Sequence, residues 1–229
     1  MAIEFVQYDD YKISAANQAS IANDTALNTT TGNLIVVCVT AWVGGAINNV
    51  SDTAGNTYIR ATGIEHATSP NQNAEIWYAK NITGNASNIT TVAFTTLSSY
   101  PFISVAEFSG ADTSSPLDDT STNEDTSETD HSSGDMTAST SDSVIIGVSC
   151  FSVNTLTTVG TGFTILKSVV TTYDFAEYRI ITSTGDYDAD FTTSILNAAI
   201  AGAIFKGTGT SPSTLSNIQS ITGVGNIQW

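Results

Sequence analysis

Two runs of apolar and mostly β-branched residues, Leu34–Val39 and Val144–Val148, constrain the fold of this chain more than any other feature. A strand that covers one face of a core alternates apolar and polar residues, whereas these runs are apolar at almost every position. Such continuity indicates strands that are buried on both faces or lie at the centre of a sheet. The chain therefore needs apolar cover on both sides of these strands.

Similar strand signals follow each run, so the chain resembles two imperfect copies of one unit. Glu75–Tyr78 and Glu177–Ile180 each combine a glutamate with aromatic and apolar residues, and Val105–Gly110 and Gly202–Gly207 each end an apolar strand with a glycine. We expect an all-β protein, a jelly-roll-type β-sandwich of about ten antiparallel strands built from two similar halves. Two separate domains are disfavoured, because each half alone would leave an apolar sheet face uncovered.

The predicted sandwich spans residues 32–207 and leaves the two ends of the sequence outside it. Residues 1–31 are expected to form an N-terminal docking arm, in which Ala15–Ala26 supports at most a short helical turn. Residues 208–229 are expected to form a linker and a C-terminal docking or oligomerisation tail. Inside the sandwich, residues 112–142 contain almost nothing apolar, which predicts a long acidic, solvated loop.

The C-terminal tail carries a short repeat of its own. The triplet Asn217-Ile218-Gln219 returns as Asn226-Ile227-Gln228, after a segment rich in Gly, Thr, Ser and Pro. A tethered apolar segment of this length cannot bury its own side chains, so it requires another surface, either copies of itself or the body to which it is attached. The sequence therefore predicts a homo-oligomer in which the tail residues Ile218, Ile221, Val224, Ile227 and Trp229 make the assembly contacts.

The charge balance limits the partners of the chain. Six Lys and Arg residues stand against 22 Asp and Glu residues, which gives a net charge of −16. This charge disfavours binding to nucleic acids and to anionic membranes, and leaves divalent cations, uncharged glycans and proteins as partners. We also find neither the basic-then-apolar pattern of a signal peptide nor an apolar run long enough to span a membrane.

Nucleophilic catalysis has little support in the sequence. A Gly-x-Ser-x-Gly motif is absent, and His131 lies in the acidic segment, where a lone histidine is more often a surface residue than a general base. Cys38 and Cys150 lie in apolar strand-like runs, which favours two buried free thiols over a disulfide.

Three glutamates, Glu75, Glu107 and Glu177, interrupt apolar strands and are the best candidates for a paired-carboxylate enzyme such as a glycosidase. The stronger interpretation is that a glutamate between apolar neighbours points to solvent, because strand side chains alternate between faces. We therefore expect a protein that is not an enzyme.

Aspartates and aromatics supply the candidate binding residues. Asp186, Asp188 and Asp190 would share one face of an extended strand and could hold Ca²⁺, against the slightly stronger alternative of a solvated turn. No other cofactor is expected, because the few His and Cys residues do not support a zinc site. Tyr100 and Tyr173 are the aromatics best placed to contact a glycan, whereas Trp42 and Trp77 are expected in the core.

Several segments together resemble a known domain. They are Gly-Asn-Leu-Ile-Val-Val from Gly32, Asp-Thr-Ala-Gly-Asn-Thr-Tyr from Asp52, Ile-Trp-Tyr-Ala-Lys-Asn from Ile76, Val-Ala-Glu-Phe-Ser-Gly-Ala-Asp-Thr-Ser-Ser-Pro-Leu-Asp from Val105 and Gly-Phe-Thr from Gly162. This succession resembles a jelly-roll-like domain of bacteriophage virion and tail-associated proteins, and the Asn-Ile-Gln-Ser-Ile-Thr-Gly-Val tail is similar to short repeats of phage fibre proteins.

The resemblance implies a fold and a context rather than one activity. It implies a virion structural protein, such as a capsid decoration, fibre or tail-adhesion component, that is assembled in the host cytoplasm with other virion proteins. The alternative is a carbohydrate-binding module that recognises cell-surface or environmental glycans.

Overall fold

The computed structural model describes residues 2–13, 16–42, 46–66, 72–126, 129–167, 171–194 and 197–208. These residues form strands and connecting loops without a helix, which confirms the predicted all-β sandwich. The strands of the first half are β1 (Glu4–Lys12), β2 (Gln18–Ala22), β3 (Leu34–Trp42), β4 (Ile47–Asp52), β5 (Ile59–His66), β6 (Gln72–Ala79) and β7 (Thr90–Ser109). Those of the second half are β8 (Leu117–Asp125), β9 (Asp130–Ser132), β10 (Met136–Ala138), β11 (Ser143–Val159), β12 (Thr164–Ile165), β13 (Thr171–Ile181), β14 (Gly185–Tyr187), β15 (Asp190–Thr193) and β16 (Ala198–Lys206).

Each half of the chain builds one main antiparallel sheet, and the two sheets have the same strand order. The first sheet runs β1-β7-β3-β6-β5, and the second runs β8-β16-β11-β13-β12. In both, an early strand is paired with the last strand of its half, and the most apolar strand lies at the centre. The prediction of two similar halves is thereby confirmed, whereas the strand orders do not establish the expected jelly-roll topology.

The register of the strands extends this equivalence to single residues. Phe108 pairs with Leu34 and Phe205 pairs with Val144, so the two phenylalanines occupy equivalent positions. Tyr78 pairs with Val36 and Tyr178 with Ile146 in the same way. Across the interface between the sheets, the ring of Phe108 meets that of Tyr178 at 5.6 Å and the ring of Phe205 meets that of Tyr78 at 5.2 Å. The two sheets therefore pack as a pseudo-two-fold pair.

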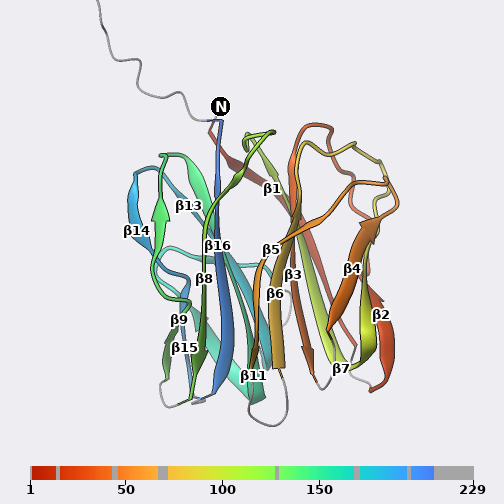
Figure 1. Ribbon diagram of the computed structural model, residues 1–229, viewed down its shortest axis with the longest axis vertical. Helices are drawn as coiled ribbons and strands as arrows, with labels where there is room; N and C mark the ends of the chain where they lie inside the picture. The colour runs from red at the N-terminus through yellow and green to blue at the C-terminus, as the bar shows by residue number, and fades with distance from the viewer. Residues whose placement is uncertain are drawn as a thin grey trace, which may run out of the picture.

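The continuous apolar runs are explained by cover on both faces of each main sheet. In β3, Leu34, Val36 and Cys38 join the core between the sheets. Ile35 and Val37 join a second core on the outer face, which β2 and β4 cover through their pairing with the first part of β7. Figure 1 shows β2 and β4 beyond β3 and β7, and β9, β14 and β15 beyond the other sheet.

An outer layer likewise covers the apolar outer face of the second sheet. Short strands that include β10 and β15 cover two apolar clusters on that face. The first contains Met136, Ile145, Phe163 and Ile204, and the second contains Phe151, Phe175, Phe191 and Ile200. The sandwich thus has four layers and three levels of apolar packing.

The predictions of an arm at residues 1–31 and of a loop at residues 112–142 are wrong, because both segments contain strands. The expected N-terminal arm contributes β1 to the main sheet and β2 to the outer layer, so the sandwich begins well before residue 32. The expected acidic loop contributes β8, β9 and β10. In β8 the carboxylates of Asp118 and Asp119 accept the main-chain N–H groups of Ser139 and Thr137, so acidic residues hold a strand in place there.

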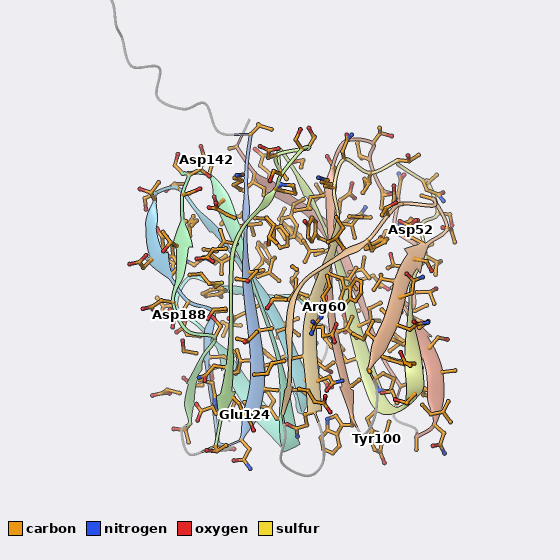
Figure 2. The ribbon with its side chains drawn as sticks, in the orientation of Figure 1. Asp52, Arg60, Tyr100, Glu124, Asp142 and Asp188 are labelled. Carbon is orange, nitrogen blue, oxygen red and sulfur yellow. The ribbon has the colours of Figure 1, made fainter. Side chains whose placement is uncertain are left out.

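The described chain starts and ends at one pole of the sandwich, which we call the terminal pole. Thr208 donates its main-chain N–H to the carbonyl of Gly110 at 2.9 Å. Gly110 has a φ of +75°, and a Cβ there would overlap with the carbonyl oxygen of Ala2. Asp142 also lies at this pole, because its carbonyl accepts the N–H of Gly207 (Figure 2). Tyr100 and Glu124 lie at the opposite end, the distal pole (Figure 2).

The equivalence of the two halves predicts matched effects of core truncation. Phe108→Ala and Phe205→Ala each remove a fully buried ring from the interface between the sheets, and each should lower the free energy of unfolding by about 3–5 kcal/mol. Urea unfolding of the full chain measures both. Val6→Ala, at an exposed position of β1, should change the free energy of unfolding by about 0.5 kcal/mol or less. A much smaller loss for one phenylalanine would show that the two halves do not support each other equally.

Candidate functional site

The three strand glutamates are buried, so the expectation that they point to solvent is wrong. Glu75 is 8% exposed, and Glu107 and Glu177 are each 0% exposed. The alternation of strand side chains does hold, but the faces away from the central core are themselves covered by the outer layers. Each glutamate is held by its own set of partners, and Glu75 accepts hydrogen bonds from Arg60 at 2.9 Å and from the Trp77 indole at 2.8 Å.

Glu107 is a buried carboxylate whose two oxygens are both satisfied. Its Oε1 accepts the main-chain N–H of Thr30 and the amide of Asn33, each at 2.7 Å, and its Oε2 accepts the amide of Gln7 at 2.6 Å. Gln7 belongs to β1 and the other two residues precede β3. The carboxylate therefore ties the first strand and the segment before β3 to the sheet, a structural function.

Glu177 has the opposite environment. Its Oε2 accepts the N–H of Gly160 at 3.3 Å, and its Oε1 is buried without a hydrogen-bond partner. Burial raises the pKa of Glu177 well above its usual range, and the negative charges of Asp190 and Asp188 raise it further, against the hydrogen bond from Gly160. Folding thus favours the protonated form of Glu177 relative to the unfolded chain.

The three aspartates proposed for calcium do not lie on one strand. Asp186 lies in β14, which pairs with β10, and Asp190 lies in β15, which pairs with β11 and β9. The chain changes partner strand between them, so the assumption of one extended strand fails. Asp186 accepts a hydroxyl from Thr137 at 2.8 Å, and Asp188 accepts one from Ser132 at 2.6 Å. Throughout the described ranges, no group of three or more His, Cys, Asp or Glu residues is placed to hold a metal ion.

His131 is not a surface residue, contrary to the expectation for the acidic segment. Its side chain is buried, with Nδ1 3.1 Å from Oδ2 of Asp125 and Nε2 3.3 Å from the hydroxyl of Thr193. The imidazole packs against the rings of Phe151 and Phe191. This carboxylate, imidazole and hydroxyl series has the order of a catalytic triad, but Thr193 is only 5% exposed. The group joins β8, β9 and β15 beneath the surface.

A second buried polar cluster lies between the two sheets, and sequence reasoning did not identify it. Lys167 donates to the main-chain carbonyl of Asp174 at 2.5 Å, and its Nζ lies 3.9 Å from the carboxylate of that residue. The carboxylate also accepts the hydroxyl of Thr40, and the ammonium lies 4.6 Å from the ring centre of Phe102. The signal that could have indicated it is Lys167, a lysine that directly follows the apolar residues Ile165 and Leu166.

The thiols and the aromatics complete the candidate residues. Cys38 and Cys150 are buried and free, as predicted, and burial raises the pKa of the Cys38 thiol. Tyr100 is 40% exposed and meets the half-buried Trp42 edge to face at 6.0 Å. Trp42 donates its indole N–H to the sulfur of Cys150 at 3.0 Å. The side chain of Tyr173 and the tail residues Ile218, Ile221, Val224, Ile227 and Trp229 lie outside the described part of the chain.

No protein family model matches the chain, and neither a curated protein nor a solved structure matches it. Within the described ranges, no helix is long and apolar enough to cross a membrane.

The environment of Glu177 predicts that its neutral analogue stabilises the protein. The pKa of Glu177 is raised above its usual value of 4.5. Its contribution to stability is therefore fully present below about pH 4.5 and is lost as the pH rises through the folded-state pKa. Glu177→Gln should raise the free energy of unfolding at neutral pH by at least about 1 kcal/mol. Urea unfolding between about pH 4 and pH 8 measures this, and the gain should grow with pH. A constant difference across this range would contradict it.

The same substitution at Glu107 should have the opposite sign. Glu107→Gln replaces one acceptor oxygen by an amide donor, although three donors point at the carboxylate. We expect a loss of about 1–3 kcal/mol in the free energy of unfolding at neutral pH. The exposed Glu4→Gln serves as the control for both variants and should leave stability nearly unchanged. Equal stability of Glu107→Gln and wild type would show that these hydrogen bonds do not hold the strand.

Proposed function

We propose that the protein is a non-enzymatic structural component of a bacteriophage virion, and that it assembles through residues 208–229 into a homo-oligomer and with other virion proteins. The observation that supports this proposal is the position of Thr208 at the terminal pole, next to the first described residues. A tail attached there would fix one pole to a support and direct the distal pole outward. Such an arrangement suits a capsid decoration, fibre or tail-adhesion protein.

The body of the protein suits such a use. The apolar faces of its main sheets are covered by each other and by the outer layers. Two of its strand carboxylates, those of Glu75 and Glu107, accept hydrogen bonds that hold strands and loops together. The net charge of −16 makes the bodies repel one another and disfavours binding to nucleic acid or to an anionic membrane. Association would then depend on the tail, where apolar residues are spaced along a short segment with little charge.

Substitutions in the tail test this assignment. Ile221→Asp with Ile227→Asp should convert an oligomer of the full chain to monomers, because each buried isoleucine contributes roughly 1.5–3 kcal/mol. Association should weaken at least about a hundredfold. Multi-angle light scattering measures the mass, and thermal unfolding verifies that the sandwich remains folded.

The matched control is Ser216→Asp with Ser220→Asp, which adds the same two charges to the same segment. It should keep the oligomer. An oligomer that survives the isoleucine substitutions, or that is lost equally in the serine control, would contradict apolar assembly through the tail.

A second candidate function, carbohydrate binding, is favoured by one observation at the distal pole. Tyr100 is exposed there and stacks edge to face on Trp42, so an aromatic surface is presented at the end of the sandwich away from the tail. Tyr and Trp combine an apolar ring face with a polar O–H or N–H group, and this combination is suited to contact with sugar rings. The two functions are compatible in a virion protein that contacts host glycans.

A further inference from the structure

Gln72, the first residue of β6, is the most anomalous polar residue in the described chain. It is 1% exposed, and neither its Nε2 nor its Oε1 has a hydrogen-bond partner. A buried amide normally has partners, and leaving both atoms unpaired destabilises the fold. A methionine of similar volume would fill the same space without this cost. A residue that costs stability in this way indicates a binding function.

The position of Gln72 connects it to the aromatic surface of the distal pole. Gln72 and Trp42 are direct partners in the register of β6 and β3, so their side chains project from the same face of the sheet. Trp42 is also paired with Ser99 of β7, and the next residue in β7 is Tyr100. Trp42 therefore lies between the buried amide on one neighbouring strand and the exposed phenol on the other.

The backbone of β7 is distorted at this point. Thr40 pairs with Phe102 and Trp42 pairs with Ser99, so Tyr100 and Pro101 together oppose one residue of β3, which is a β-bulge. Tyr100 has a φ of +52°, in the left-handed region that large aromatic residues rarely adopt. Bulges and strained residues of this kind redirect a side chain and concentrate at ligand sites. Here the distortion coincides with the exposed position of the Tyr100 ring.

We propose that Trp42, Gln72 and Tyr100 form a binding subsite for an uncharged saccharide at the distal pole. Tyr100 supplies the exposed ring on which a sugar ring stacks, the half-buried Trp42 supports that ring, and the amide supplies the buried donor and acceptor. A pair of neighbouring hydroxyl groups satisfies both atoms of the amide, because each hydroxyl donates and accepts. The charge of −16 disfavours an anionic ligand. This inference rests on the second candidate function and assigns it to three residues.

The test uses the full chain labelled with ¹⁵N and titrated with methyl glycosides of glucose, galactose, mannose and N-acetylglucosamine. Binding should shift the NMR signals of the Gln72 side-chain amide and the Trp42 indole N–H. A trisaccharide of the bound sugar is then compared with its methyl glycoside. Tighter binding of the trisaccharide would assign the ligand to a glycan chain, and equal binding would assign it to a single sugar unit.

Two variants and a control test the residues. Gln72→Met should weaken binding at least about tenfold and raise the melting temperature, because it removes the unpaired amide. Tyr100→Ala, which changes a surface side chain, should weaken binding by a similar factor. Tyr11→Ala is the matched control, since Tyr11 is 39% exposed on β1 against 40% for Tyr100, and it should bind as the wild type does.

Three results would overturn the proposal. If no glycoside shifts these signals, both the subsite and the carbohydrate-binding function fail. If a glycoside binds equally well to Gln72→Met and Tyr100→Ala, the function stands but the site lies elsewhere. If Gln72→Met lowers the melting temperature, the amide has a structural function and the argument from its missing partners fails. None of these results bears on assembly through the tail, which light scattering measures separately.

Discussion

The rest of the structure depends on one constraint: β3 and β11 carry apolar side chains on both faces, and both faces must be buried. A sheet with one apolar face is satisfied by one partner layer, but here each main sheet needs two. The pseudo-two-fold pairing of the sheets supplies the inner cover for both at once, through Phe108 with Tyr178 and Phe205 with Tyr78. The outer cover differs between the two sheets. On the first sheet, β2 and β4 pair with the first part of β7 and cover the outer face. On the second sheet, short strands such as β10 and β15 cover it.

The outer layers also determine the chemistry of the strand carboxylates. Glu107 and Glu177 both project to an outer face, yet one is fully hydrogen-bonded and the other has an unpaired oxygen. The difference is the number of donors that the covering segment brings. Beside Glu107, the covering segment contributes a main-chain N–H and an amide, whereas beside Glu177 the neighbours are Gly160 and two further carboxylates. The same residue type is therefore fully hydrogen-bonded in one half of the molecule and has an unpaired oxygen and a raised pKa in the other.

The sequence was sufficient for the central strands and insufficient for the edge strands and the covering strands. Leu34–Val39 and Val144–Val148 were identifiable because burial on two faces leaves a continuous apolar run. β1, β2 and β8 gave no such signal, since an edge strand is held by main-chain hydrogen bonds and side-chain contacts that polar residues also make. The candidate sites failed for a related reason. Spacing placed Asp186 and Asp190 on one strand, and acidic neighbours placed His131 in solvent, but the partner strands of the outer layer decide both positions.

The two poles of the sandwich differ in how well their backbone and polar groups are satisfied. At the terminal pole, Gly110 admits the close approach of Ala2 and main-chain hydrogen bonds hold Thr208, so the structure there is tightly fixed. At the distal pole, the bulge at Tyr100 and the unpaired amide of Gln72 are tolerated although both reduce stability. Both features lie at the end of strands whose inner parts are buried in three levels of apolar packing. That packing provides the stability that offsets the bulge and the unpaired amide at the pole opposite Thr208.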